Sequence, residues 1–363
     1  MEVTWAQALA WRLERQLLDP VGQLSVPEVV GRLGAVLSMD ESLAELAVRT
    51  RRVMSEAGEL RAALEAGEVV KAFVFRGAVH YLRPEDGGVY LALRAAGRQW
   101  ELRSWVEFYG LTAEAWPDFR AVVREALAGG PLTIGELGEA LTAQRAYAHL
   151  RPVFDQDAYT LVKPLTWQGD MSIAPSREGQ LTFQRLDTNP RWAGVPELDE
   201  AGPRAITAYL RAYGPATADH VHQWFGGGLS AGKKRIDRWL GELAGSLETV
   251  DVEGTAALVV REDAVSLAAA EPSEVVRFVP GHDQWVMGPG TKDVHIVPPA
   301  TRDAVTRKAA LVLVGGVVSG TWRVRGDDLT VTWLGGGTAP RAAIEAEAER
   351  LAAVLGDRRL VLD

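Results

Sequence analysis

A recurring order of elements constrains the fold of this chain more than any other sequence feature. Between residue 1 and about residue 265, amphipathic helical segments are followed by a pair of β segments, and this order occurs three times. Helices followed by a β-hairpin are typical of a winged helix. The sequence therefore predicts three winged-helix units in tandem.

The first unit illustrates the pattern. Apolar residues at helical spacing within residues 5–17 predict a first helix. A second helix is predicted to start near Ser25, a good N-cap, and a third near Asp40 or Ser42. Two β segments within residues 69–82 complete the unit.

The later units follow the same order. Residues 131–137 introduce a helix, and residues 161–183 contain the end of a helix and a hairpin. The third unit runs from 203 to 254, with a hairpin that turns at Glu253. Its Gly226-Gly227-Gly228 lacks the Lys-Ser/Thr of a phosphate-binding loop, and we interpret it as a flexible turn before a basic helix.

The C-terminal part changes character. Short strands between Gly-rich turns are predicted within residues 275–333, and an amphipathic helix over residues 339–355 is predicted to close the chain. The fold class is thus α+β. The predicted domains are winged-helix domain 1 at residues 1–128, winged-helix domain 2 at 129–200, winged-helix domain 3 at 201–265 and a C-terminal β-rich domain with its closing helix at 266–363.

Composition narrows the chemistry. The 363 residues include no cysteine, and the six histidines show no paired-ligand spacing, so we expect neither a metal nor another cofactor. No stretch approaches the roughly 20 apolar residues of a membrane span, and no basic and apolar leader precedes the first helix. We expect a cytoplasmic protein without membrane contact.

The net charge of −9 argues against a general nucleic-acid coat. One region has the opposite balance, since residues 204–240 contain six basic residues and two acidic ones. The basic residues are Arg204, Arg211, Lys233, Lys234, Arg235 and Arg238. This region is either a phosphate-facing surface or a solvated helix face.

Several strings along the chain occur together in one known family. They are Trp5 through Gln16, Val29 through Val36, Phe75 through His80, Lys163 through Gly169 with Pro175-Ser176, Phe278-Val279-Pro280 with Asp283, and Gly320 through Arg323. Each string is weak, but their order and spacing are specific. In these strings the sequence resembles the AlkZ-like and YcaQ family of bacterial winged-helix DNA glycosylases, over nearly the whole chain.

The resemblance implies a fold and a reaction. Three tandem winged helices and a C-terminal β domain would form a C-shaped body around duplex DNA, and the protein would be a monomer. Members of this family excise N7-alkylated purines, including bulky adducts and interstrand crosslinks. Their catalytic pair lies in a Gln-Φ-Gln or Gln-Φ-Asp motif, where Φ is apolar, just after the second helix.

This chain departs from the motif at one position. The corresponding residues are Ser38-Met39-Asp40, so Met39 and Asp40 match and Ser38 replaces the first glutamine. A carboxylate at position 40 could stabilise an oxocarbenium ion and orient the attacking water. Ser38 is too short to replace a glutamine amide unless a water or another side chain fills the gap. We expect weakened or retargeted activity.

Asp40 also has a purely structural interpretation. An aspartate directly before Glu41-Ser42-Leu43 is a good helix N-cap, and capping would also set the direction of the carboxylate. Ser38 is interpreted either as part of the catalytic motif or as a tolerated small polar residue. No lysine lies at the motif to form a Schiff base, so no strand cleavage is expected.

Other candidates have two interpretations each. Arg76 either contacts a phosphate or pairs with an acid, and His80 either faces the lesion or is a hydrogen-bonded histidine at a strand end. His282 and Asp283 suit a site loop and equally a buried turn. The predicted DNA-binding residues are Arg76, His80, Lys233, Lys234, Arg235 and Arg238.

These observations favour a monofunctional DNA glycosylase that acts on N7-alkylated purines in duplex DNA. A catalytically silent DNA- or adduct-binding protein is the alternative, because the motif lacks its glutamine. A transcription regulator is a third possibility, disfavoured because no dimerisation coiled coil is evident for reading a palindrome.

Overall fold

The computed structural model describes residues 1–227 and 230–363, so Gly228, in the turn predicted before the basic helix, lies outside the described residues together with Leu229. The chain forms two compact units. Unit 1 consists of residues 1–60, 206–224 and 240–363, and unit 2 of residues 61–205 and 225–239. The four consecutive domains expected from the sequence stay a prediction.

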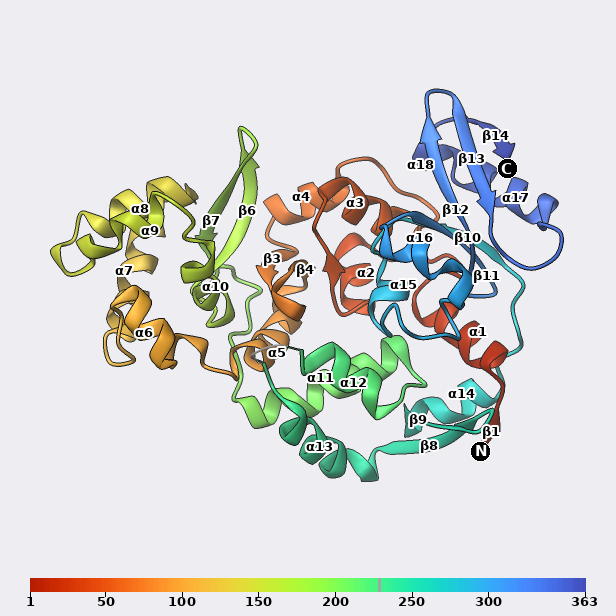
Figure 1. Ribbon diagram of the computed structural model, residues 1–363, viewed down its shortest axis with the longest axis horizontal. Coiled ribbons are helices and arrows are strands. Elements are labelled where there is room, and N and C mark those ends of the chain that lie inside the picture. The colour runs from red at the N-terminus through yellow and green to blue at the C-terminus, as the bar shows by residue number, and fades with distance from the viewer. Residues whose placement is uncertain (228–229) are drawn as a thin grey trace. The chain divides into compact units, whose positions relative to one another are not determined.

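Runs of helices and runs of strands follow one another along the chain, which makes this a mixed α and β protein (Figure 1). The helices of unit 1 are α1 Trp5–Arg15, α2 Val26–Arg32, α3 Glu41–Arg49, α14 Ala264–Ala268, α15 Gln284–Met287, α16 Arg302–Thr306, α17 Arg341–Arg350 and α18 Ala352–Leu355. Those of unit 2 are α5 Pro84–Ala95, α6 Arg103–Tyr109, α7 Trp116–Ala126, α8 Ile134–Thr142, α9 Arg151–Phe154 and α10 Tyr159–Trp167. Residues of both units contribute to α4 Glu59–Glu65, α11 Leu198–Tyr213, α12 Ala218–Phe225 and α13 Lys233–Glu242.

Unit 1 contains two sheets. A three-stranded sheet has the order β1-β8-β9, and a five-stranded sheet the order β10-β11-β12-β13-β14. The strands are β1 Glu2–Val3, β8 Leu247–Val252, β9 Thr255–Val260, β10 Val276–Val279, β11 Ala310–Val314, β12 Val317–Arg325, β13 Asp328–Trp333 and β14 Arg359–Leu362. The N-terminal β1 runs parallel to β8, so the hairpin predicted around Glu253 gains a strand from the far end of the chain.

Unit 2 joins two of the predicted hairpins in one antiparallel sheet. Its strands are β3 Val70–Phe73, β4 Val79–Leu82, β5 Leu132–Thr133, β6 Met171–Arg177 and β7 Gln180–Arg185. The order within the unit is β4-β3-β6-β7-β5, and Lys71 pairs with Ile173 where the hairpins meet. The sequence predicts each hairpin, but not that the two share a sheet.

Helix α1 is buried on two faces. Trp5 and Trp11 pack with β8, β9 and α14, whereas Leu9 and Leu13 pack with α15 and the C-terminal sheet. This double burial explains the apolar spacing of the segment. The helix ends at Arg15, and Leu17 lies beyond it with a φ of 59°.

The C-terminal end differs from the expectation. The helix predicted over residues 339–355 is present as α17 and α18, but it does not close the chain, because β14 follows it. β14 pairs in parallel with β13, with Leu360 opposite Leu329. A four-residue strand that pairs with a segment about 30 residues away gives no local periodic signal.

Candidate functional site

The segment Ser38-Met39-Asp40 lies in unit 1, between the two-residue β2 Val36–Leu37 and α3. Asp40 is the N-cap of α3, as the sequence predicts. Its Oδ1 accepts hydrogen bonds from the backbone N–H of Ser42 at 2.8 Å and of Leu43 at 3.3 Å, and from the Ser42 hydroxyl at 2.6 Å. The capping role is confirmed, and it fixes the direction of the carboxylate.

Asp40 keeps its charge and half of its hydrogen-bonding capacity. The hydrogen bond from the Ser42 hydroxyl, aided by the backbone N–H groups of Leu43 and Ser42, lowers the pKa of the Asp40 carboxyl. All three hydrogen bonds end on Oδ1, so Oδ2 accepts none from the described residues. An ionised carboxylate oxygen is therefore available to a ligand.

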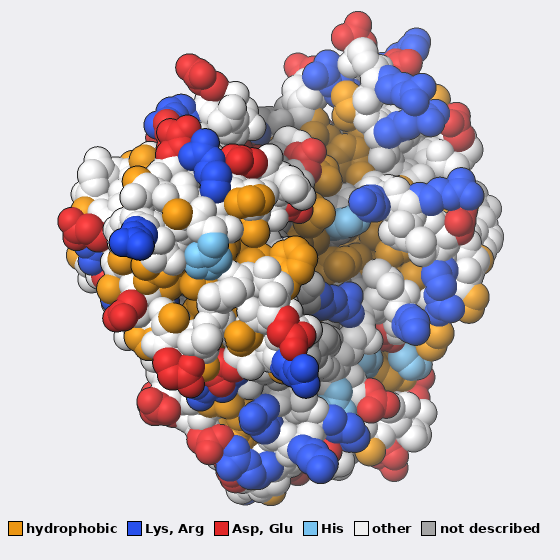
Figure 2. All heavy atoms as spheres, turned by 60° about the vertical axis from the view of Figure 1, so that its left-hand side comes forward, with side chains coloured by type: hydrophobic (Ala, Val, Ile, Leu, Met, Phe, Trp, Pro, Cys, Tyr) orange, Lys and Arg blue, Asp and Glu red, His pale blue; other side chains and the backbone are white. Residues whose placement is uncertain are grey.

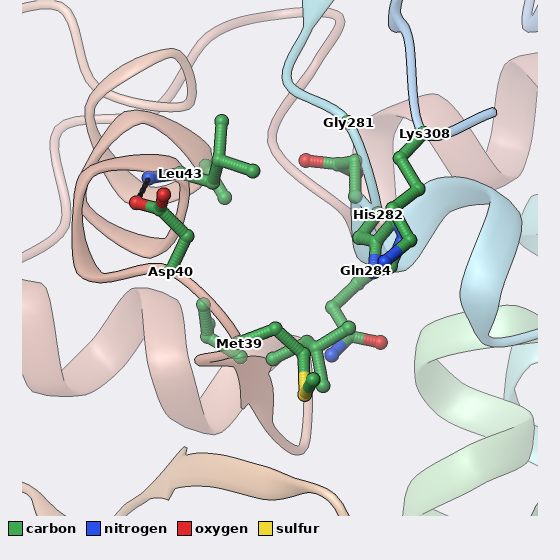
Figure 3. Close-up of a pocket in the computed structure, with 11 residues that line it drawn as sticks. Met39, Asp40, Leu43, Gly281, His282, Gln284 and Lys308 are labelled. Carbon is green, nitrogen blue, oxygen red and sulfur yellow. Dashed lines mark hydrogen bonds between the residues drawn. The ribbon is translucent and has the colours of Figure 1, made fainter.

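A cavity of about 260 Å³ adjoins Asp40 within unit 1 (Figure 3). Its lining is mostly apolar, with a few polar groups. The lining residues are Val36, Leu37, Met39, Asp40, Leu43, Ala47, Gly281, His282, Asp283, Gln284 and Lys308. In Figure 3, Met39 and Asp40 come from the segment before α3, whereas His282, Gln284 and Lys308 come from segments on the other side. Such a mixture is typical of a small-molecule or substrate site.

Ser38 is not among the residues that line this cavity. Its side chain is buried, and its Oγ has no hydrogen-bond partner among the described residues. Met39 is 64% exposed, which is unusual for a large apolar side chain. Only Asp40 of the motif therefore presents a charged group at the cavity.

Asp283 is held by a buried ion pair. Its two carboxylate oxygens accept from Arg51 Nη1 at 2.8 Å and Nη2 at 2.6 Å, and neither side chain is exposed. Oδ1 also accepts from the backbone N–H of Trp285 at 2.8 Å and caps α15. This pairing supports the buried-turn interpretation of Asp283 and leaves it little capacity for chemistry.

His282 and Lys308 approach the cavity from strained positions. Both have left-handed backbones, with φ of 61° and 66°. Burial, and then the charge of Lys308, lowers the pKa of the His282 imidazole. A Cβ at Gly281 would lie 2.2 Å from the Lys308 carbonyl oxygen, so the two loops touch and only glycine fits there. Strained residues of this kind often occur at functional sites.

Sequence reasoning missed two of the polar residues at this cavity. Gln284 directly follows Asp283, so its position next to a family string is a signal in the sequence that points to it. Lys308 lies far along the chain in no recognisable motif, and only the tertiary fold brings it to Asp40.

Arg76 and His80 lie in unit 2. Arg76 is exposed, has a φ of 53°, and forms no ion pair with a described residue. His80 is only 3% exposed, its Nδ1 lies 3.0 Å from the Ala78 carbonyl oxygen, and its ring meets that of Phe75 edge-on. A DNA contact of Arg76 or His80 stays a prediction, and the burial of His80 favours the structural interpretation.

The basic residues of α13 are engaged to different degrees. Lys233 contacts Asp237 at 3.1 Å, Arg238 pairs with Asp199, and Arg235 donates to the Ala231 carbonyl at 3.0 Å. Lys234 is exposed and forms no ion pair in the described part of the chain. It therefore has the least internal competition for a phosphate.

Residues 1–227 and 230–363 contain neither a metal-binding cluster nor a membrane-spanning helix. No group of three or more histidine, aspartate or glutamate side chains is arranged to hold a metal ion. No helix in the same residues is long and apolar enough to cross a membrane.

The comparisons with known proteins agree with one another. The family model described as "DNA glycosylase AlkZ-like" matches residues 30–354. The interstrand DNA cross-link repair glycosylase of Streptomyces sahachiroi is 35% identical over 367 residues, which covers 99% of each chain. The solved structure of the Streptomyces sahachiroi DNA glycosylase AlkZ is similar with a TM-score of 0.93 and 34% identity, over 100% of both chains.

The fold is thus that of a DNA glycosylase, an enzyme that hydrolyses N-glycosyl bonds. The family model covers most of the chain, and the sequence identity of 35% is too high for a likeness of the fold alone. This chain belongs to the AlkZ-like DNA glycosylase family.

The buried ion pair makes a stability prediction. Arg51→Met should lower the free energy of unfolding by about 3–5 kcal/mol, because it leaves the Asp283 charge buried and unpaired. Arg51→Met combined with Asp283→Asn should recover part of this loss, since the charge is removed and the amide oxygen can still cap α15. Urea unfolding followed by tryptophan fluorescence measures both.

The exposed pair Arg341–Glu345 is the control, and Arg341→Met should cost less than about 1 kcal/mol. A double variant as unstable as the single one would contradict this account.

The burial of His80 predicts that the free energy of unfolding depends on pH. Burial lowers the pKa of His80 from 6.5 to about 4, so the folded protein excludes a proton that the unfolded chain binds below pH 6.5. The folded state therefore loses this contribution to its stability as the pH falls from 6.5 towards 4. Between pH 7 and pH 5 the loss should be about 2 kcal/mol. The free energy of unfolding of His80→Gln should fall less over this interval by that amount, and an equal pH dependence in the two proteins would disprove the assignment.

Proposed function

We propose that this protein is a monofunctional DNA glycosylase that hydrolyses the N-glycosidic bond of N7-alkylated purines in duplex DNA, including bulky or crosslinked ones. The observation that carries the proposal is the ionised Asp40 carboxylate, which has one uncommitted oxygen and belongs to a residue that lines a cavity. The Streptomyces sahachiroi relative is named an interstrand DNA cross-link repair glycosylase, and this name supports the choice of lesion.

The chemistry suits a single carboxylate. N7 alkylation gives the purine a positive charge, so the base leaves with little acid assistance, and the barrier shifts to the sugar, which develops oxocarbenium character. A water oxygen forms a bond to C1′ while the C1′–N9 bond breaks, and the electron pair of that bond neutralises the purine. Asp40 stabilises the cation and accepts the proton of the water. The products are the free base and an abasic site.

The proposal that the enzyme is monofunctional depends on whether Lys308 can form a Schiff base with the sugar. The motif has no lysine, but Lys308 lines the same cavity as Asp40. Schiff-base lysines are activated by burial or by a neighbouring cation, and Lys308 is exposed. We therefore propose hydrolysis without strand cleavage, and borohydride treatment during turnover should trap no covalent complex with DNA.

DNA binding in this proposal depends on local charges. Figure 2 shows lysine and arginine side chains interspersed with acidic ones on the face in view, in keeping with the net charge of −9. We propose that Lys234 and Arg76, which are exposed and unpaired among the described residues, contact phosphates, with Lys233, Arg235 and Arg238 as the basic surface around Lys234. The three winged-helix units, the C-shaped arrangement around duplex DNA and the monomeric state stay predictions.

The first test is base release. Purified protein is incubated with duplex DNA containing N7-methylguanine or a bulky N7-guanine adduct, and the released base is measured. Asp40→Asn should lower release at least about tenfold, or ~1.4 kcal/mol of transition-state stabilisation. It should leave the thermal midpoint nearly unchanged, because asparagine also caps helices. The control Asp157→Asn changes a carboxylate of unit 2 that accepts from the Tyr159 N–H, and it should retain activity.

A second candidate function is favoured by Ser38. If the missing glutamine amide is essential, the protein is a catalytically silent DNA or adduct binder. Binding of adducted duplex without base release, by the wild type and by Asp40→Asn alike, would establish this second function in place of the first.

The phosphate contacts predict a salt effect. Lys234→Gln should weaken binding to duplex DNA to a similar extent for different sequences, and should reduce the slope of log K against log salt by about 1. Lys233→Gln is the matched control on the same helix, and its effect should be smaller because Lys233 already contacts Asp237. Fluorescence anisotropy over a range of salt concentrations measures both. Equal slopes for wild type and Lys234→Gln would exclude Lys234 from the DNA contact.

A further inference from the structure

The wall of the cavity opposite Asp40 carries two basic side chains. His282 lies in the loop between β10 and α15, and Lys308 in the loop between α16 and β11. Both residues line the cavity, and in Figure 3 both lie across it from Asp40. Burial, and then the charge of Lys308, lowers the pKa of the His282 imidazole, so the two side chains are close enough to interact. We call them the His282–Lys308 pair.

Neither member of this pair is committed to another part of the protein. The Lys308 side chain is exposed and forms no ion pair or hydrogen bond with a described residue. The His282 ring takes part in no hydrogen bond, ion pair or ring stack within the described residues. Each of the other five histidines has such a contact, namely His80, His149, His220, His222 and His295. The pair can therefore bind an anion without breaking a contact within the described protein.

The backbone holds both side chains at this wall in an unfavourable conformation. The φ values of 61° at His282 and 66° at Lys308 lie in the left-handed region, which disfavours residues with a Cβ. The two loops touch, since a Cβ at Gly281 would lie 2.2 Å from the Lys308 carbonyl oxygen. Glycine or asparagine would adopt this conformation more readily, but neither offers a cation. A histidine and a lysine at these two positions point to a ligand that needs their side chains.

An oxyanion fits the His282–Lys308 pair better than a purine does. An ammonium group binds phosphate as a point charge, and an imidazole N–H adds a directed hydrogen bond. An N7-alkylated purine carries a positive charge, which Lys308 would repel. The phosphodiester is the anionic part of a nucleotide, and the rest of the cavity lining, which is mostly apolar, suits the base and the sugar.

We infer that His282 and Lys308 form a phosphate-binding subsite, which holds a phosphodiester of the DNA strand beside the nucleotide to be excised. This inference rests on the proposed function for its ligand, duplex DNA, but not on base release. Lys308 supplies the charge. The lowered pKa of His282 keeps its imidazole neutral at neutral pH, so that it donates one hydrogen bond. A lysine that binds a phosphate is also unavailable for a Schiff base with the sugar.

The test compares four variants with the wild type. Lys308→Asn and His282→Asn each remove one side chain of the pair, and asparagine tolerates the left-handed backbone. Lys308→Arg keeps the charge. Lys292→Gln is the matched control, because Lys292 is an exposed lysine of unit 1 that does not line the cavity.

Two measurements are made on each protein, besides a thermal melt. The probe is a duplex with a tetrahydrofuran abasic-site analogue, which has no glycosidic bond to hydrolyse at that position. Its affinity is measured by fluorescence anisotropy over a range of salt concentrations. The imidazole NMR signals of His282, identified by their loss in His282→Asn, are followed on addition of the same duplex and, separately, of inorganic phosphate.

The expected results differ between the variants. Lys308→Asn weakens binding about fivefold at about 0.15 M salt and reduces the slope of log K against log salt by about 1. His282→Asn weakens binding at least about threefold but keeps the wild-type slope, because a neutral imidazole releases no counterion. Lys308→Arg and Lys292→Gln keep the wild-type slope. The duplex shifts the His282 signals of the wild type, and both asparagine variants keep or raise the thermal midpoint.

Other results overturn the inference. A wild-type slope in Lys308→Asn would rule out a phosphate contact of this lysine. Lower thermal midpoints in both asparagine variants, with no recovery of affinity in Lys308→Arg, would make the pair structural. His282 signals that respond to inorganic phosphate but not to the duplex would assign the site to a free anion. A reduced slope in Lys308→Asn, with no base release by the wild type from any adduct, would uphold the subsite and refute only the proposed hydrolysis.

Discussion

The ion pair between Arg51 and Asp283 determines where one wall of the cavity lies. Arg51 also donates to the carbonyl oxygens of Gln16 at 3.1 Å and Ala47 at 2.7 Å, so one guanidinium connects the chain after α1, the helix α3 and the loop before α15. Because both charged side chains are fully buried, neither can change its position without leaving an unpaired charge in the core. The residues on both sides of Asp283 are consequently held at the cavity.

The opposite wall is built by a helix start. Asp40 uses one carboxylate oxygen to cap α3, and its other oxygen accepts no hydrogen bond from the described residues. A site on a helix terminus is more rigid than one on a free loop. His282 and Lys308 line the cavity from its other side. Both have left-handed backbones, which direct their side chains differently from those of an extended chain.

Family membership and cavity geometry answer different questions. Membership in the AlkZ-like DNA glycosylase family establishes the class of reaction, because the match covers residues 30–354 and the fold agrees with a TM-score of 0.93. It does not establish which residues of this chain carry out that reaction. The uncommitted oxygen of Asp40 is the observation on which the proposed mechanism rests.

The sequence by itself determined the local elements and the positions of the chemistry-bearing strings. Ser25, Asp40 and the apolar spacing of residues 5–17 predicted helices that the structure contains, because capping and periodicity act over a few residues. Only the tertiary structure decided which strings meet. Parallel pairing of β14, the joining of two hairpins in one sheet, and the approach of Gln284 and Lys308 to Asp40 all depend on contacts between distant segments. Contacts of this kind depend on which distant segments are buried together, and this leaves no periodic trace along the chain.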